Sequence, residues 1–235
     1  MIVTETMLSH LPPVVQRYMT YSGVIGKAWI NTVSLTYRGK FRLGKDKPWM
    51  PIYARQVYTT NPPGFQWKAR FKLFGLPLMF GNDTYKNGQG RMFGKLAGLI
   101  TLFDASDEKL IQGTMVRYLQ EMAWFPTAYL SDYITWEAVD DHTADVIFTY
   151  AEKQVRGRMI FDDDGRLLTF IAERYQENNG TYNLHTWSTP MTDYQVFDGI
   201  KVPTTGYGVW QMPDADLTYI TMKVSKLQYN VPVEF

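Results

Sequence analysis

Strict alternation of apolar and polar residues is the feature that most constrains the fold of this chain. Between residues 32 and 37, the apolar side chains of Val33, Leu35 and Tyr37 alternate with Thr and Ser. Between residues 65 and 73, the same alternation places Phe65, Trp67 and Phe71 on one face. A period of two is typical of half-buried β-strands. An aromatic face of this size has to be covered by other parts of the chain, so the pattern predicts a sheet with a covering layer.

The same pattern recurs along most of the chain and predicts a meander of many antiparallel strands. Turn signals separate the segments, among them Asn87-Gly88, Asp164-Gly165 and Asp198-Gly199. Residues 96–103 form an apolar run. The further predicted strands span residues 53–59, 79–85, 88–93, 134–139, 144–150, 154–161, 167–176, 184–194, 205–211 and 217–229.

Helical spacing interrupts this meander in two places. Residues 8–21 have an apolar face with Pro12 and Pro13 at its start, which predicts an N-terminal helix. Residues 107–125 have the spacing of a longer helix that ends before Pro126, followed by a short helix to about residue 132. The sequence therefore predicts a mainly β (α+β) protein with one helical insertion.

Composition narrows the class of protein. A chain of 235 residues and 27.3 kDa without a low-complexity linker is expected to form one domain over residues 1–235. The net charge is +1, and Lys and Arg are taken to be dispersed among the acids, so nucleic acid is not an expected partner. The chain contains no Cys, which excludes disulfides and thiolate chemistry.

No apolar run approaches the roughly 18 residues that a membrane-spanning helix needs, so no membrane span is expected. The first residues lack the basic and apolar regions of a secretion signal. As the sequence stands, a cytoplasmic location is predicted. If an upstream segment was removed, the protein is expected to be periplasmic or associated with a membrane.

Motifs for metal or cofactor binding are weak. The three histidines, His10, His142 and His185, show no metal-ligand spacing. Asp162-Asp163-Asp164-Gly165 departs from the calcium-loop pattern in the residues that follow, and the Gly-rich segment 88–95 fits no phosphate-loop pattern. Neither a metal nor a cofactor is expected.

The segment from Arg117 to Pro126 is the most informative for function. Arg117 and Glu121 are four residues apart and therefore lie side by side on a helix, with Trp124 on the same face. A neighbouring stripe of that helix contains Tyr118 and Phe125. The ion pair is either a structural salt bridge or a polar anchor in a hydrophobic ligand cavity.

The best catalytic candidates are carboxylates in apolar surroundings, where burial raises the pKa. Glu121 is the first candidate and Asp83 the second. Arg117 or Arg174 would then stabilise an anion. A structural role for each carboxylate remains open, because Arg117 is within reach of Glu121 and Asp83 lies beside a turn.

Tryptophan is abundant, with seven residues in the chain. Any single one is expected to pack in the core. Together they exceed what a compact core readily fills, so some of them are expected to line a cavity. The tryptophans on predicted strands or on the inner helix are Trp67, Trp124, Trp136, Trp187 and Trp210.

Several short motifs together resemble an uncharacterised bacterial family, known only as a domain of unknown function. The most specific is Arg117-Tyr118-Leu119 with Glu121 and Trp124-Phe125-Pro126. The others are Leu11-Pro12 with Gln16-Arg17-Tyr18, Lys47-Pro48-Trp49-Met50-Pro51, Pro62-Pro63-Gly64-Phe65-Gln66-Trp67, Gly81-Asn82-Asp83-Thr84-Tyr85, Trp136-Glu137, and Phe161 with Gly165 and Arg174-Tyr175. The resemblance implies the half-barrel of LolA-type lipoprotein carriers, in which a strongly curved antiparallel sheet wraps helices around a hydrophobic cavity.

On this basis, the first functional hypothesis is a binding protein for a small or medium hydrophobic ligand of a lipid-like kind, held between sheet and helices. Arg117, Glu121 and Arg174 are its predicted polar contacts. The alternatives are an enzyme that uses Glu121 as general acid or base in the same cavity, and a structural or assembly protein with an aromatic docking surface. The oligomeric state stays open. The predicted ligand-lining side chains are Trp67, Phe71, Tyr118, Trp124, Phe125, Trp136 and Trp187.

Overall fold

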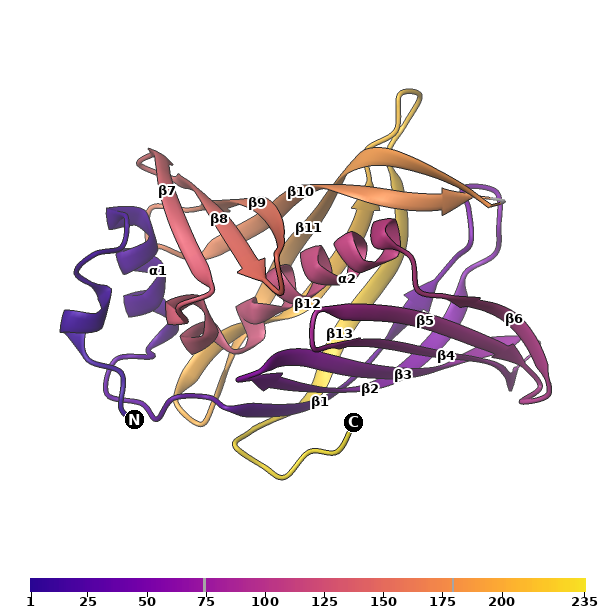
Figure 1. Ribbon diagram of the computed structural model, residues 1–235, viewed down its shortest axis with the longest axis horizontal. Helices are drawn as coiled ribbons and strands as arrows, with labels where there is room; N and C mark the ends of the chain where they lie inside the picture. The colour runs from indigo at the N-terminus through magenta and orange to yellow at the C-terminus, as the bar shows by residue number, and fades with distance from the viewer. Residues whose placement is uncertain (74, 179) are drawn as a thin grey trace.

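A computed structural model describes residues 1–73, 75–178 and 180–235 of the chain, which form a strongly curved sheet around a central helix (Figure 1). The helices are η1 (Glu5–Leu8), α1 (Pro13–Ser22), α2 (Glu108–Glu121), η2 (Met122–Trp124) and η3 (Pro126–Leu130). The strands are β1 (Thr32–Phe41), β2 (Met50–Thr60), β3 (Pro63–Leu73), β4 (Leu76–Lys86), β5 (Gln89–Leu96), β6 (Ile100–Ala105), β7 (Ile134–Asp140), β8 (Thr143–Tyr150), β9 (Lys153–Phe161), β10 (Leu167–Asn178), β11 (Thr181–Phe197), β12 (Ile200–Trp210) and β13 (Leu217–Tyr229). In these described ranges, every helix is too short or too polar to cross a membrane.

All thirteen strands belong to one antiparallel sheet with the order β6-β5-β4-β3-β2-β1-β13-β12-β11-β10-β9-β8-β7. Strands that follow each other in the chain are neighbours, and β13 pairs with β1 to join the two halves. The edges are β6 and β7, and the segment from α2 to η3 connects them. Along this path α2 contacts β4 and β5 on one side and β9 and β10 on the other. The predicted half-barrel with a helical insertion is confirmed.

The helices follow from local sequence signals. Asp107 caps α2, because its carboxylate accepts hydrogen bonds from the backbone N–H groups of Lys109 and Leu110. The helix tightens into η2 and ends before Pro126, where η3 begins. The predicted insertion is thus confirmed, with its last turns in 3₁₀ geometry. The predicted N-terminal helix is shorter than expected, since α1 begins at Pro13 and a separate turn, η1, precedes it.

Strand β6 was not predicted, although residues 96–103 were recognised as apolar. It is the edge strand of the sheet, and the successive side chains Leu102 and Phe103 are each 45% exposed. Because both of its faces meet solvent, the alternation that identifies a half-buried strand is missing.

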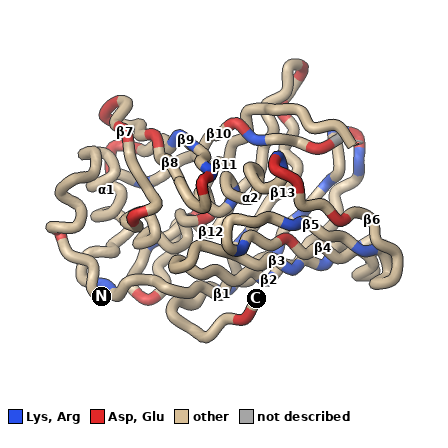
Figure 2. The backbone as a smooth tube through the Cα atoms, in the orientation of Figure 1, with Lys and Arg blue, Asp and Glu red and all other residues tan. Residues whose placement is uncertain are grey.

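The expected dispersal of Lys and Arg among the acids is wrong. Between residues 32 and 105, which span β1 to β6, the chain has twelve Lys and Arg but three acids, so the remainder has twelve Lys and Arg against twenty acids. Lys and Arg segments recur along β2, β3, β4 and β5 in Figure 2, where acidic segments are sparse. The net charge of +1 therefore combines a basic segment, residues 32–105, with an acidic remainder of the chain.

Candidate functional site

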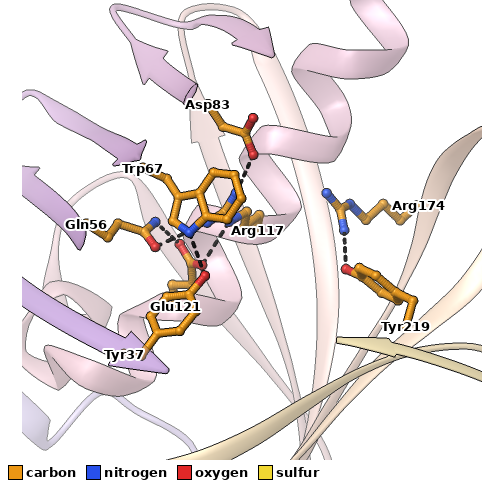
Figure 3. A network of polar contacts seen from close by, with 8 residues as sticks. All are labelled: Tyr37, Gln56, Trp67, Asp83, Arg117, Glu121, Arg174 and Tyr219. Atoms are coloured by element: carbon orange, nitrogen blue, oxygen red, sulfur yellow. Dashed lines mark hydrogen bonds and ion pairs between the residues drawn. The ribbon is translucent and has the colours of Figure 1, made fainter. Parts of the chain in front are cut away.

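Arg117 is the centre of a buried polar network on the concave face (Figure 3). Its Nη1 donates to Asp83 Oδ2 at 2.7 Å, and its Nε donates to Glu121 Oε1 at 2.8 Å. Its Nη2 donates to Gln56 Oε1 at 3.1 Å. Gln56 Nε2 in turn donates to Glu121 Oε2 at 2.7 Å, which closes a ring of hydrogen bonds. Every nitrogen of the guanidinium thus has an acceptor.

Helix spacing and strand register together assemble this network. Arg117 and Glu121 are one helical turn apart on α2, as the sequence predicted. On the sheet, Gln56 of β2 lies opposite Trp67 of β3, and Trp67 lies opposite Asp83 of β4. Directly paired residues share a face, so these three side chains form one row that points at α2.

Burial controls the charges of the network. The side chains of Arg117, Asp83 and Glu121 are 14%, 5% and 3% exposed. Desolvation raises the pKa of Asp83 to about 6, although Arg117 acts in the opposite direction. Burial lowers the pKa of Arg117, but the carboxylates of Glu121 and Asp83 outweigh this effect and raise it. One guanidinium thus pairs with two carboxylates, and burial raises the pKa of one of them, Asp83.

Aromatic side chains enclose the Arg117 guanidinium. Its centre lies 4.9 Å from the ring of Phe65 and 5.0 Å from that of Trp67, distances typical of cation–π contacts. Trp67 Nε1 donates a hydrogen bond to the hydroxyl oxygen of Tyr37. Burial raises the pKa of Tyr37, so this phenol stays neutral. Arg117 is therefore held by rings as well as by acceptors.

A second arginine, Arg174 of β10, lies on the same concave face, and its guanidinium points toward the Arg117 network in Figure 3. It stacks 4.7 Å from the ring of Trp187 and 5.6 Å from that of Trp210. Its Nη1 is 3.4 Å from Tyr219 Oη, a long hydrogen bond. Among the described residues, its buried Nε has no hydrogen-bond partner and no carboxylate comes within 4.0 Å of its guanidinium. Arg174 is thus a partly buried cation with no carboxylate in salt-bridge contact among the described residues, although its charge acts on Asp83 and lowers the pKa of that carboxyl.

Six rings connect the two arginines. We call them the aromatic arc: Trp187, Trp210, Tyr219, Phe41, Phe71 and Trp67. Successive ring centroids along the arc are 6.5, 5.9, 6.1, 5.1 and 6.1 Å apart, within the range of favourable aromatic pairs. Phe41 and Tyr219 in its middle are only partly buried. The arc is therefore a continuous apolar surface with a cation at each end.

The structure brings together Arg117, Glu121, Asp83, Trp67 and Phe71 of the predicted site residues. Trp187 and Arg174 join them through the aromatic arc. The other four predicted lining residues, Tyr118, Trp124, Phe125 and Trp136, lie elsewhere.

Tyr118 and Phe125 are fully buried in the core, where their rings pack against each other at 5.9 Å. Trp136 of β7 lies outside the site and packs on Tyr129 at 5.5 Å. Trp124 donates to the carbonyl oxygen of Pro203 and borders a cavity of about 10 Å³. This volume suffices for about one water molecule. The cavity that Trp124 borders is therefore too small for a lipid-like ligand.

Sequence reasoning missed Gln56, Tyr37, Phe65 and the middle of the aromatic arc. Gln56 had a detectable signal, because it is a polar residue at an inward-facing position between Ala54 and Tyr58 of β2. Phe41 and Tyr219 had none, since both lie at strand ends next to connections. Their proximity depends on the pairing of β1 with β13.

Replacing Gln56 is expected to destabilise the protein. Gln56→Leu removes one acceptor from Arg117 and one donor from Glu121, so two buried charged groups lose a partner. We expect the free energy of unfolding to fall by about 1–3 kcal/mol. Chemical denaturation measures this change. Gln66→Leu, on the opposite face of the neighbouring strand β3, is the matched control, and equal losses in both variants would show that the network does not need Gln56.

Among the described residues, no cluster of three or more His, Asp or Glu side chains is placed to hold a metal ion. Both carboxylate oxygens of Glu121 accept hydrogen bonds, from Arg117 and from Gln56. This arrangement stabilises the packing of α2 on the sheet. Catalysis by Glu121 stays a prediction.

The model of a family of unknown function, DUF6544, matches residues 1–222. The chain belongs to this family. Membership of a family of unknown function, as predicted, is confirmed. A search of curated proteins found no match to this DUF6544 chain.

Among solved structures, a DUF1329 family protein from Desulfovibrio piger is similar to this DUF6544 protein with a TM-score of 0.50 and 13% identity, over 94% of this chain and 92% of that one. An outer membrane lipoprotein-sorting protein domain from Vibrio parahaemolyticus has a TM-score of 0.49 and 10% identity, over 94% and 92% of the two chains. A LolA superfamily protein from Nitrosomonas europaea has a TM-score of 0.48 and 7% identity, over 93% and 94%. At these identities the likeness concerns the fold alone.

Proposed function

We propose that this DUF6544 protein binds a small or medium hydrophobic, lipid-like ligand that carries an acidic headgroup. The observation that carries the proposal is Arg174, a partly buried guanidinium between Trp187 and Trp210 with a buried, unpaired Nε and no carboxylate within salt-bridge distance among the described residues. A buried donor without a partner is costly, so an acceptor that approaches it is favoured. A carboxylate or phosphate group of a ligand would supply that acceptor.

The aromatic arc provides the place for the apolar part of the ligand. Phe41 and Tyr219 are only partly buried, and Tyr219 also contacts the Arg174 guanidinium. A hydrocarbon chain that leaves Arg174 along the arc would cover these two rings. Each Å² of apolar surface removed from water contributes roughly 25 cal/mol before the costs of association.

Arg117 has a different role in this proposal. Its donors are already used by Asp83, Glu121 and Gln56, so it fixes the position of α2 relative to the sheet. Gly113, one turn earlier on α2, faces Arg174, since a Cβ atom at Gly113 would be in van der Waals contact with Arg174 Nε at 3.4 Å. Arg117 therefore orients the helix that packs beside the ligand-binding arginine.

A binding experiment with paired ligands tests the proposal. A fatty acid and the fatty alcohol of equal chain length are titrated against the protein, with its Trp fluorescence as the signal. We expect the acid to bind more tightly, and Arg174→Met to weaken acid binding by about 10- to 100-fold, because a charge-assisted hydrogen bond is lost. Affinity for the alcohol should change little.

Arg166→Met is the matched control, since Arg166 pairs with Asp162 in the turn between β9 and β10. It should leave both affinities unchanged. If the unaltered protein bound the acid and the alcohol with equal affinity, Arg174 would not be the binding site of the acidic headgroup. Binding of neither compound would contradict the proposed function.

A further inference from the structure

Two rows of basic side chains cross the convex face of the sheet, opposite the aromatic arc. Row one consists of Lys226, Thr36, Arg55 and Lys68, which are paired across β13, β1, β2 and β3. Row two consists of Lys223, Arg38, Tyr53 and Arg70 on the same strands. The Lys and Arg side chains of both rows are exposed. Paired residues have Cβ atoms about 4.5–5.5 Å apart, so these charges form one dense patch.

This patch lacks internal compensation. Arg55 lies directly opposite Lys68, and Arg38 directly opposite Lys223, arrangements that destabilise a sheet. In the described part of the chain, no carboxylate lies within 4.0 Å of any charged group in the two rows. A surface that concentrates like charges at a cost to stability is suited to an anionic partner.

A groove lies within this basic patch. It has a volume of about 380 Å³, and Arg55, Gln66 and Lys68 form its floor. Pro232, Glu234 and Phe235 line its other side. Glu234 brings one carboxylate into the groove, so the groove carries less net positive charge than the two rows, which remain the main basic surface.

Exposed aliphatic side chains border the basic patch at one end of the sheet. The connections β1–β2, β3–β4 and β5–β6 lie at the same end, because neighbouring strands are antiparallel. They carry Leu43, Leu76, Leu99 and Ile100, which are 69%, 59%, 85% and 61% exposed. We call these four residues the apolar rim. Apolar tips beside a basic face are the combination that holds a protein at a membrane surface.

We propose that the convex face docks on an anionic phospholipid bilayer, with the apolar rim inserted among the lipids. Charge alone would also suit nucleic acid. The rim decides in favour of a bilayer, because aliphatic side chains enter a hydrocarbon layer, whereas single-stranded nucleic acid is held by stacking on aromatic rings. The two rows contain one aromatic residue, Tyr53. This proposal does not depend on the ligand at Arg174.

Vesicle binding of the full chain tests the proposal. Phosphatidylcholine vesicles with and without phosphatidylglycerol are sedimented with the protein. We expect binding to the anionic vesicles that weakens with added salt. The variant Arg38→Gln, Arg55→Gln, Lys68→Gln and Arg70→Gln should lose at least about 100-fold in affinity. The rim variant Leu76→Ser, Leu99→Ser and Ile100→Ser should lose at least about 10-fold.

The control removes the same number of charges elsewhere, with Lys27→Gln, Lys153→Gln, Arg166→Gln and Lys201→Gln, and should keep nearly full binding. Melting temperatures establish that all variants are folded. Equal losses in the control and the basic-face variant would overturn the proposal, as would equal binding to neutral vesicles or an unaffected rim variant. If the protein bound oligothymidine but not anionic vesicles, the partner of the convex face would be nucleic acid and not a bilayer.

Discussion

Arg117→Met is expected to lower the free energy of unfolding by about 3–5 kcal/mol. The substitution keeps an unbranched chain of similar length but leaves Asp83 and Glu121 buried without their cation. Removing one partner of a buried pair costs more than the pair contributes, because the remaining charge stays desolvated. For a chain of this length the melting temperature should fall by roughly 10 °C, and differential scanning calorimetry measures it.

Neutralising the two carboxylates that lose their cation should restore part of the lost free energy of unfolding. In the triple variant Arg117→Met, Asp83→Asn and Glu121→Gln, no buried charge remains, so we expect a free energy of unfolding above that of Arg117→Met. Arg91→Met is the control, since its partner Asp104 is exposed and its melting temperature should change little. A triple variant less stable than Arg117→Met would mean that the hydrogen bonds, rather than the charges, account for the stability of the network.

Asp83→Asn should reduce the loss in the free energy of unfolding that accompanies a rise in pH. Burial raises the pKa of Asp83 from 3.8 to about 6. Between these two values the unfolded chain has released the proton and the folded chain retains it, so ionisation favours unfolding. As the pH rises from about 4 to about 7, the unaltered protein should lose about 3 kcal/mol of stability relative to Asp83→Asn, from 1.36 kcal/mol per unit of pKa shift.

Urea unfolding of both proteins across this pH range measures the difference, and effects of the other titrating groups cancel in the comparison. Asp104→Asn is the control, because the hydrogen bond from Arg91 lowers the pKa of Asp104 and its contribution has the opposite sign. A difference between unaltered protein and Asp83→Asn that stays constant would show that Asp83 remains ionised in the fold. Arg117 would then outweigh the cost of burial.

Local signals in the sequence predicted the part of the site that lies on one element. The pairing of Arg117 with Glu121 follows from helical spacing alone, and the structure shows it. Asp83 and Gln56 join the pair only because the registers of β2, β3 and β4 align them with Trp67. That alignment depends on how the three strands pair with one another. The alternation of apolar and polar residues within any one strand does not specify this pairing.

The strands themselves were predictable where one face is buried and the other is not. Strand β6 was not predicted, because both of its faces meet solvent. The basic patch was not predicted either, because the net charge is a sum over the whole chain and does not show where the charges lie in the fold. The cavity that Trp124 borders holds only about 10 Å³, and such a volume cannot be inferred from the number of aromatic side chains. Tyr118 and Phe125 are buried in the core.

The order of the strands has a kinetic consequence. Each hairpin within β1–β6 and within β7–β13 closes a short loop, but the seam between β1 and β13 joins Val33 to Tyr229, almost two hundred residues apart. Closing so long a loop costs entropy before any contact is gained, so the two half-sheets form first and the seam last. Until then, both β1 and β13 are free edges that can pair with another molecule. Newly made chains are therefore most prone to aggregate at the strands that later become the middle of the sheet.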